Sequence, residues 1–110
     1  MSRELWDVYS FDRRPTGRTM YRGDPMPEGA FHLVVHICVF SPDGHMLIQQ
    51  RRESKRSWPG LWDLSAGGCA LAGEDSRRAA ERELYEELGL RASFAGQRPA
   101  LSIGFETGFD

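Results

Sequence analysis

The chain has 110 residues, of which 14 are Lys or Arg and 16 are Asp or Glu, so its formal net charge is −2. A chain of this length supports one domain with a single core, and this near-neutral charge excludes bulk attraction to nucleic acid or anionic lipid. The longest apolar stretch, residues 33–40, is too short for a membrane span and is interrupted by His36. We therefore expect a cytoplasmic protein with neither nucleic acid nor a membrane as partner.

The first forty residues predict strands. Residues 1–30 mix aromatic side chains with turn formers, which indicates short strands joined by tight turns. Residues 31–40 carry apolar side chains on both alternating faces, a pattern typical of an interior strand covered on both sides. Residues 41–44, Ser-Pro-Asp-Gly, favour a tight turn, so we expect residues 45–50 to return as the second strand of a hairpin.

A basic loop follows the hairpin. Residues 51–56 carry four positive charges and one negative charge, and residues 61–66 predict a short strand beyond a Trp-Pro-Gly turn. We expect Trp58 and Trp62 to pack at the edge of the core, because large aromatic side chains beside such a turn do so more often than they stack on a substrate.

Glycines and a helix come next. Gly67 and Gly68 at one end and Gly73 at the other frame a predicted flexible loop. Asp75 or Ser76 can cap a helix that ends at Gly89, with apolar positions recurring every four residues at Ala80, Leu84 and Leu88. The remaining residues predict an exposed connection and then strand material around residues 101–105. An unpaired strand there would expose a sheet edge, so we also expect a homodimer.

Three glutamates stand at helical spacing. Glu83, Glu86 and Glu87 follow the i, i+3, i+4 pattern that places side chains on one side of a helix. Their oxygens suit Mg²⁺ or Mn²⁺ better than Zn²⁺. Taken alone, the spacing also fits a solvated acidic face supported by Arg78 and Arg82, and it leaves both interpretations open.

A longer pattern surrounds the three glutamates. Residues 68–90 resemble the Nudix box, G-x5-E-x7-R-E-U-x-E-E-x-G-U, at every specified position. The matching residues are Gly68, Glu74, Arg82, Glu83, Leu84, Glu86, Glu87, Gly89 and Leu90. The resemblance implies a single Nudix domain over residues 1–110, of the α/β (α+β) class, with a mixed β-sheet between helices. It also implies that later elements of that fold are missing.

The same resemblance assigns roles. It implies that Glu83, Glu86 and Glu87 hold Mg²⁺ or Mn²⁺, with the backbone carbonyl of Gly67 as a further ligand. Glu86 is also assigned to catalysis.

Arg82 and Glu74 complete the catalytic group as supports, which pair with each other or fix the carboxylates. Glycine at positions 67 and 68 lets the backbone approach metal and phosphate closely, which makes Gly68 a candidate substrate-binding residue.

A second resemblance covers residues 31–62, which look like the isopentenyl-diphosphate isomerase branch of the superfamily. The matching residues are His32, Arg51, Arg52, Ser54, Lys55, Arg56, Trp58, Pro59, Gly60 and Trp62. In that branch the basic segment faces the substrate diphosphate, so Arg51 and Lys55 are candidate phosphate contacts.

The isomerase resemblance fails where that chemistry is performed. Gly67 stands at the position of the catalytic cysteine, Cys69 at that of a metal-binding histidine, and Pro25 at that of a second histidine. We therefore interpret His32 as a hydrogen-bonded strand residue and Cys69 as an inert thiol.

Three hypotheses follow from these patterns. The favoured one is a Mg²⁺-dependent pyrophosphohydrolase that acts on a small-molecule diphosphate, such as a nucleoside diphosphate linked to another group. The alternatives are an isopentenyl-diphosphate isomerase and a catalytically silent diphosphate-binding module. Many Nudix relatives take the base that activates water from a downstream carboxylate, for which Glu106 and Asp110 are the candidates here.

Overall fold

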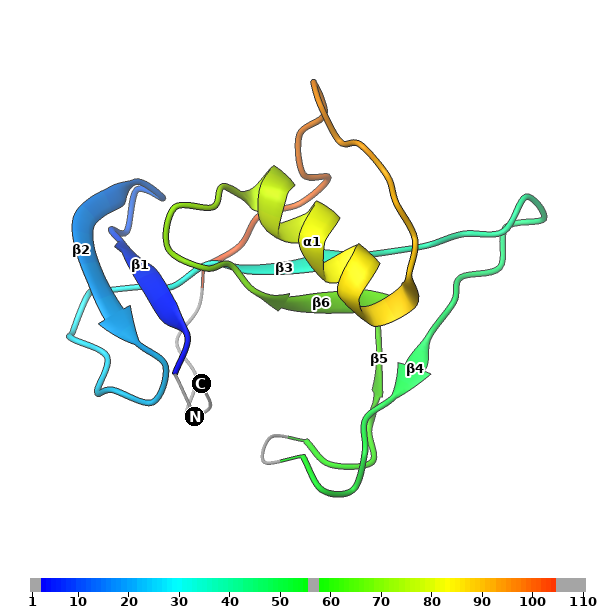
Figure 1. Cartoon of the computed structure of the whole chain (residues 1–110), viewed down its shortest axis with the longest axis horizontal. Coiled ribbons are helices and arrows are strands. Elements are labelled where there is room, and N and C mark those ends of the chain that lie inside the picture. The colour runs from blue at the N-terminus through cyan, green and yellow to red at the C-terminus, as the bar shows by residue number, and fades with distance from the viewer. Residues whose placement is uncertain (1–2, 56–57, 105–110) are drawn as a thin grey trace.

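The computed structural model of the chain describes residues 3–55 and 58–104. In these residues the strands form three two-stranded antiparallel pairs, β1 (Leu5–Tyr9) with β2 (Pro15–Tyr21), β3 (Val34–Ile37) with β6 (Ala66–Cys69), and β4 (Gln49–Gln50) with β5 (Trp62–Asp63). The helix α1 (Ser76–Leu88) lies over the β3–β6 pair (Figure 1). This combination of antiparallel strands and a helix confirms the predicted α+β class.

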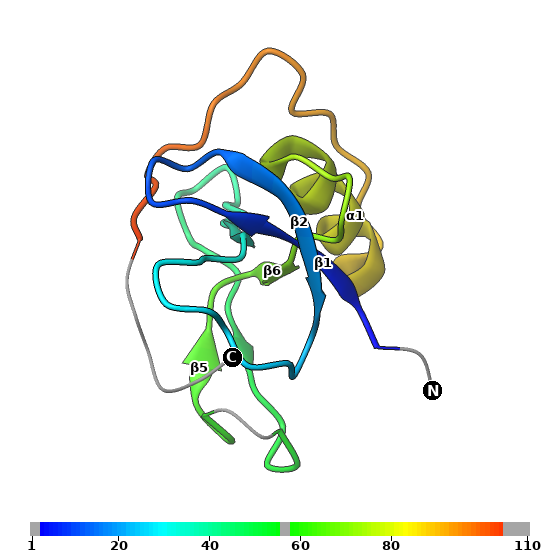
Figure 2. The same cartoon turned by 90° about the vertical axis from the view of Figure 1, so that its left-hand side faces the viewer.

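The N-terminal hairpin confirms the prediction of short strands joined by a turn. Trp6, Val8 and Met20 are buried between β1 and β2 and form a small apolar cluster, against which Cys69 packs. His32 was predicted to be a strand residue, but it lies outside β3. Its ring stacks on that of Trp6, with 4.0 Å between the ring centroids. The hairpin is thereby attached to the rest of the domain (Figure 2).

The strand predicted over residues 31–40 is shorter than expected and is covered on one side. Val35 and Ile37 are buried, whereas Val34 and His36 are exposed. Within the described residues, β3 pairs with β6 alone and α1 packs over one face of that pair. The prediction of cover on both faces was therefore wrong, because apolar composition does not say how many layers pack on a strand.

The turn at residues 41–44 is confirmed. The Gly44 N–H donates to the Ser41 carbonyl at 2.9 Å, and the Ser41 N–H donates to the His45 carbonyl at 2.8 Å. Gly44 has φ of 89°, which glycine adopts without strain. The returning segment pairs only at Met46 and in β4.

Gly67 and Gly68 lie in β6, so the predicted loop begins later than expected, after Cys69. They pair with His36 and Val35 of β3, respectively. A Cβ on Gly67 would lie 2.8 Å from the Val35 carbonyl oxygen, and one on Gly68 would lie 2.6 Å from the Glu83 carboxyl carbon. Gly67 permits the close approach of β3, and Gly68 permits that of the Glu83 side chain from α1. This explains why glycine, which is usually unfavourable in strands, occurs here.

The helix begins and ends as predicted. The Asp75 side chain accepts a hydrogen bond from the Arg78 N–H at 2.8 Å, and Gly89, with φ of 69°, terminates the helix. Ala79 and Leu84 are buried against Val35, Ile37 and Ala66. Ala80 and Leu88 are partly buried beside them, so the predicted apolar side of the helix faces the sheet. The three glutamates project from the remaining surface.

Residues 50–55 and 58–63, which we call the arm, extend away from α1 (Figures 1 and 2). The predicted strand over residues 61–66 is confined to β5 before the chain enters β6. Trp58 and Trp62 are 49% and 65% exposed, so the prediction that they pack at the core edge was wrong.

Residues 101–104 contain no strand, so that prediction was wrong over these positions. The candidate bases Glu106 and Asp110 lie outside the described residues. Among the described helices, none is long and apolar enough to cross a membrane.

Candidate functional site

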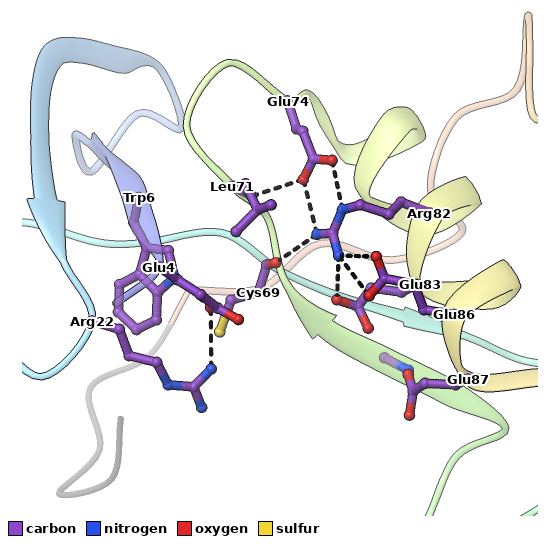
Figure 3. Close-up of polar contacts among 11 residues, drawn as sticks. Glu4, Trp6, Arg22, Cys69, Leu71, Glu74, Arg82, Glu83, Glu86 and Glu87 are labelled. Carbon is purple, nitrogen blue, oxygen red and sulfur yellow. Dashed lines mark hydrogen bonds and ion pairs between the residues drawn. The ribbon is translucent and has the colours of Figure 1, made fainter. Parts of the chain in front are cut away.

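Arg82 organises the polar surface of α1 (Figure 3). Its Nε donates to Glu74 Oε2 at 2.7 Å and its Nη2 donates to Glu74 Oε1 at 2.9 Å, so the two side chains form a bidentate pair. Nη2 also donates to the Cys69 carbonyl at 3.1 Å, which ties the helix to the end of β6. The pairing of Arg82 with Glu74 implied by the sequence is therefore present in the structure.

The same guanidinium lies between two of the predicted metal ligands. Nη1 of Arg82 is 2.8 Å from Glu83 Oε1 and 3.3 Å from Glu86 Oε1. Glu83 is largely buried, with 14% of its side chain exposed, whereas Glu86 is 55% exposed. Glu83 and Glu86 therefore share one cationic group, and the oxygens of Glu86 also reach solvent.

Glu87 is held separately. Its Oε2 accepts a hydrogen bond from the Gly67 N–H at 2.8 Å, and its Oε1 accepts one from Gln49 Nε2 at 3.2 Å. The Gly67 backbone group that contacts the cluster is thus an N–H, whereas the sequence analysis assigned its carbonyl to the metal. In Figure 3 the Glu87 carboxylate lies apart from the guanidinium.

The surroundings of Glu74, Arg82 and Glu83 shift the pKa values of these side chains. Burial raises the pKa of Glu83, and the nearby Glu87 and Glu86 add to this against the opposing hydrogen bond from Arg82. The hydrogen bonds from Arg82 lower the pKa of Glu74. Glu74 raises the pKa of Arg82 in return, so the guanidinium stays charged. The surroundings therefore favour the charged form of Glu74 and disfavour that of Glu83.

Glu74, Glu83, Glu86 and Glu87, which we call the acidic cluster, have the donor chemistry for Mg²⁺ or Mn²⁺. Three of these carboxylates contact the Arg82 guanidinium, Glu87 lies beside them, and carboxylate oxygens are the ligands that these hard cations select. A cationic nitrogen already lies between Glu83 and Glu86, and the absence of a side chain at Gly68 makes space for the Glu83 carboxylate. These residues fit a divalent cation.

The ligand arrangement itself is not preformed. Across residues 3–55 and 58–104, no group of three or more His, Cys, Asp or Glu side chains is arranged to hold a metal ion. Arg82 holds Glu83 and Glu86, while Gln49 and Gly67 hold Glu87. Bringing all three carboxylates to one cation requires at least one of these groups to move.

The two candidate phosphate contacts are not brought to the acidic cluster. Arg51 lies 3.6 Å from Asp63 across the β4–β5 pair. Lys55 is exposed and follows β4 in the chain, and Figure 1 shows that the β4–β5 pair extends away from α1. Of the predicted substrate-binding residues, Gly68 alone lies against the cluster in the described part of the chain.

Cys69 and Gln49 also lie beside the acidic cluster. The Cys69 thiol is partly buried, and desolvation raises its pKa, as expected for an inert thiol. Gln49 was not identified from the sequence, although it contacts Glu87. Its position in a polar Gln-Gln pair before a basic loop carries no signal that distinguishes it from a surface residue.

Comparison with known proteins identifies the class. Residues 30–105 match the model of the NUDIX domain, and the chain therefore belongs to the Nudix family. It is 49% identical over 107 residues to an uncharacterized Nudix hydrolase of Listeria monocytogenes, which covers 97% of this chain and 63% of that protein. It is also 35% identical over 80 residues to an isopentenyl-diphosphate Delta-isomerase of Pectobacterium atrosepticum, covering 73% of this chain and 44% of that one. The chain thus spans less than two thirds of either relative.

A solved structure supports the fold. The crystal structure of a Deinococcus radiodurans protein superposes with a TM-score of 0.69 and 27% sequence identity, covering 80% of this chain and 54% of the other. Together with the family match, it confirms the predicted Nudix fold. The relatives also confirm the resemblance to both hydrolases and isomerases of the superfamily.

Proposed function

We propose that this chain is the metal-binding part of a Mg²⁺-dependent hydrolase, with Mn²⁺ as a substitute. Its substrate is a small molecule with a diphosphate linkage, either a nucleoside diphosphate joined to another group or a related organic diphosphate. One observation carries the proposal: within a complete Nudix box, Glu83 and Glu86 already share the cationic Nη1 of Arg82. Because guanidinium nitrogen and a metal ion are both attracted to these oxygens, the same pair suits a divalent cation.

The residues of the acidic cluster have different roles in this proposal. Glu83, Glu86 and Glu87 hold the cation. When bound, the cation neutralises phosphate charge and makes water more acidic. Glu74 fixes Arg82 through its bidentate pair, and Arg82 keeps the helix and the end of β6 together.

Glu86 is the residue to which we assign proton transfer. Its side chain is more than half exposed, so one oxygen can contact water while the other faces Arg82. Water adds to one phosphorus, the bridging P–O bond breaks, and the proton lost by the water passes to the Glu86 carboxylate.

Substrate contacts outside the cluster are assigned to the arm. Arg51 and Lys55 carry the charges that would bind the diphosphate, and the absence of a side chain at Gly68 lets phosphate approach β6. The distance of the arm from α1 requires the substrate to span the two regions or the arm to move toward the helix.

The isomerase alternative is favoured by the identity to the Pectobacterium atrosepticum enzyme. Against it, Gly67 stands where that chemistry places a cysteine, and the nearby Cys69 thiol has a raised pKa and is partly buried. We therefore favour hydrolysis.

The test is a substrate screen with Mg²⁺. Nucleoside diphosphate sugars, dinucleoside polyphosphates and isopentenyl diphosphate are incubated with the chain, and released nucleotide or phosphate is measured. We expect turnover of at least one conjugate, and Glu87→Gln should lower kcat by about 100-fold or more, because it removes a charged metal ligand. Glu81→Gln on the same helix is the control, since it keeps the oxygen that accepts the Phe94 N–H.

Each other result has a defined meaning. An unchanged kcat in Glu87→Gln discards the metal assignment. A shifted double bond in isopentenyl diphosphate, seen by NMR without phosphate release, identifies an isomerase. Thermal stabilisation by a diphosphate without turnover under either metal identifies a binding module.

A further inference from the structure

Glu87 differs from its neighbours because neutral donors from outside the helix hold both of its oxygens. The Gly67 N–H lies 2.8 Å from one oxygen, and Gln49 Nε2 lies 3.2 Å from the other. Gly67 comes from β6 and Gln49 from β4, 38 residues before Glu87 in the chain. A carboxylate has about four lone-pair sites, so these two bonds leave others for a cation.

The orientation of the Gln49 amide is determined by its surroundings. Its Nε2 faces three oxygens, namely Glu87 Oε1, the Ser65 carbonyl at 3.1 Å and the Leu64 carbonyl at 3.4 Å. An amide turned by 180° would point its own oxygen at these acceptors, which is unfavourable. The donor side of Gln49 is therefore directed at Glu87.

The backbone that holds Gln49 is itself fixed by a buried group. Ser65 has no solvent-exposed surface. Its hydroxyl donates to the Leu47 carbonyl and accepts the Val39 N–H at 2.8 Å. These bonds connect the segments before β4 and after β5, so Gln49 starts from a constrained position.

We propose that Gln49 is a positioning residue for Glu87. Together with the Gly67 N–H, it fixes the direction in which the free lone pairs of the Glu87 carboxylate point, and so prepares this carboxylate for a divalent cation. Outer hydrogen-bond partners of metal ligands commonly act in this way. The inference rests on the proposed function for the existence of the metal, and it adds a residue that the Nudix box does not contain.

The neighbouring glutamine provides a matched control. Gln50 has the same side chain, one position further along β4, but its Nε2 donates to the Gly60 carbonyl at 2.8 Å within the arm. Methionine has nearly the same length as glutamine and cannot donate a hydrogen bond. Gln49→Met removes the contact with Glu87 together with the contacts to the Ser65 and Leu64 carbonyls, whereas Gln50→Met removes a backbone contact. A Glu87→Gln background separates the contact with Glu87 from the two backbone contacts.

The experiment measures Mn²⁺ binding directly, by the loss of the EPR signal of free Mn²⁺, without substrate. We expect Gln49→Met to weaken Mn²⁺ binding about tenfold, and Gln50→Met to leave it unchanged. In a Glu87→Gln background, Gln49→Met should cause little further loss, because the two residues act as one unit. Melting curves establish that each variant folds.

A second measurement needs no variant at Gln49. In the wild-type chain, the side-chain amide signal of Gln49 in a ¹⁵N NMR spectrum should shift when Mg²⁺ is added, while that of Gln50 should not. If Gln49→Met unfolds the chain, this titration still tests the proposal.

Three outcomes overturn the inference. They are wild-type affinity in a folded Gln49→Met, an equal loss of affinity with and without Glu87, and an unmoved Gln49 amide during Mg²⁺ binding. A wild-type chain that binds no Mn²⁺ instead overturns the proposed function, and the inference with it, so the two failures are distinguishable.

Discussion

The acidic cluster and the arm differ in how firmly their charged side chains are held. In the cluster, the Arg82 guanidinium contacts Glu74, Glu83 and Glu86, with closest distances of 2.7, 2.8 and 3.3 Å. In the arm, Arg51 lies 3.6 Å from Asp63, and Lys55 is exposed. One region is a network of short ion pairs around a single guanidinium, and the other has a longer ion pair and an exposed lysine.

This difference indicates which charged side chains are held in fixed positions before a ligand binds. In the cluster, one guanidinium makes several short contacts with Glu74 and Glu83, so its loss should have a sizeable effect on stability. The Arg51–Asp63 pair in the arm is longer, at 3.6 Å, so its loss should have a smaller effect. We therefore expect substitutions in the cluster to change both stability and metal binding, and substitutions in the arm to change mainly substrate binding.

The largest effect is expected when the guanidinium is removed from the cluster. Arg82→Met should lower the free energy of unfolding by about 2–4 kcal/mol, because it leaves three carboxylates without their shared cation. Added Mg²⁺ should raise the stability of this variant more than that of the wild type, in which the cation competes with Nη1 for Glu83 and Glu86. Urea unfolding with and without Mg²⁺ measures both effects.

Arg77→Met is the control on the same helix. Among the residues that the structure describes, Arg77 forms one ion pair, a partly exposed one with Glu81 at 4.0 Å, so its loss should cost about 0.5 kcal/mol or less. An equal Mg²⁺ increment in Arg82→Met and the wild type would show that the guanidinium does not compete with the metal.

The two glycines of β6 separate stability from metal binding. Gly67→Ala places a Cβ 2.8 Å from the Val35 backbone oxygen, and this clash should cost about 1–3 kcal/mol because the backbone cannot move away. Gly68→Ala meets only the end of the Glu83 side chain, at 2.6 Å, which can rotate. It should therefore cost less stability but weaken Mn²⁺ binding. The idea fails if both variants lose stability equally and bind Mn²⁺ equally well.

Acid should weaken the Glu74 pair. Because Arg82 lowers the pKa of Glu74 in the folded chain, this carboxylate stabilises the fold above its ordinary pKa, and the effect is lost as pH falls through the folded value. Glu74→Gln should thus be less stable than the wild type by about 1–2 kcal/mol at pH 7. The gap should shrink below about pH 4. Urea titrations at pH 7, 5 and 3 test this, and a constant gap would contradict it.

The helix could be predicted because its ends depend on residues that are neighbours in the chain. Features that depend on contacts between distant residues could not be predicted. Asp75 and Gly89 bound α1 because capping depends on neighbours in the chain. The start of the loop was predicted too early, at Gly67 and Gly68, because their place in β6 depends on β3, some thirty residues earlier. The contact of Gln49 with Glu87 spans 38 residues, and no pattern in the sequence specifies it.

The smallest stability effect is expected in the arm. Arg51 and Asp63 form a longer ion pair, at 3.6 Å, so Arg51→Met should change the free energy of unfolding by about 1 kcal/mol or less. If Arg51 contacts phosphate, the same change should raise KM about tenfold and leave kcat nearly constant, because the lost interaction contributes equally to substrate and transition-state binding. Arg52→Met, in the same loop, should leave KM unchanged. An unchanged KM in Arg51→Met would mean that the basic loop is only a solvated surface, and that the acidic cluster recognises the diphosphate through its bound cation alone.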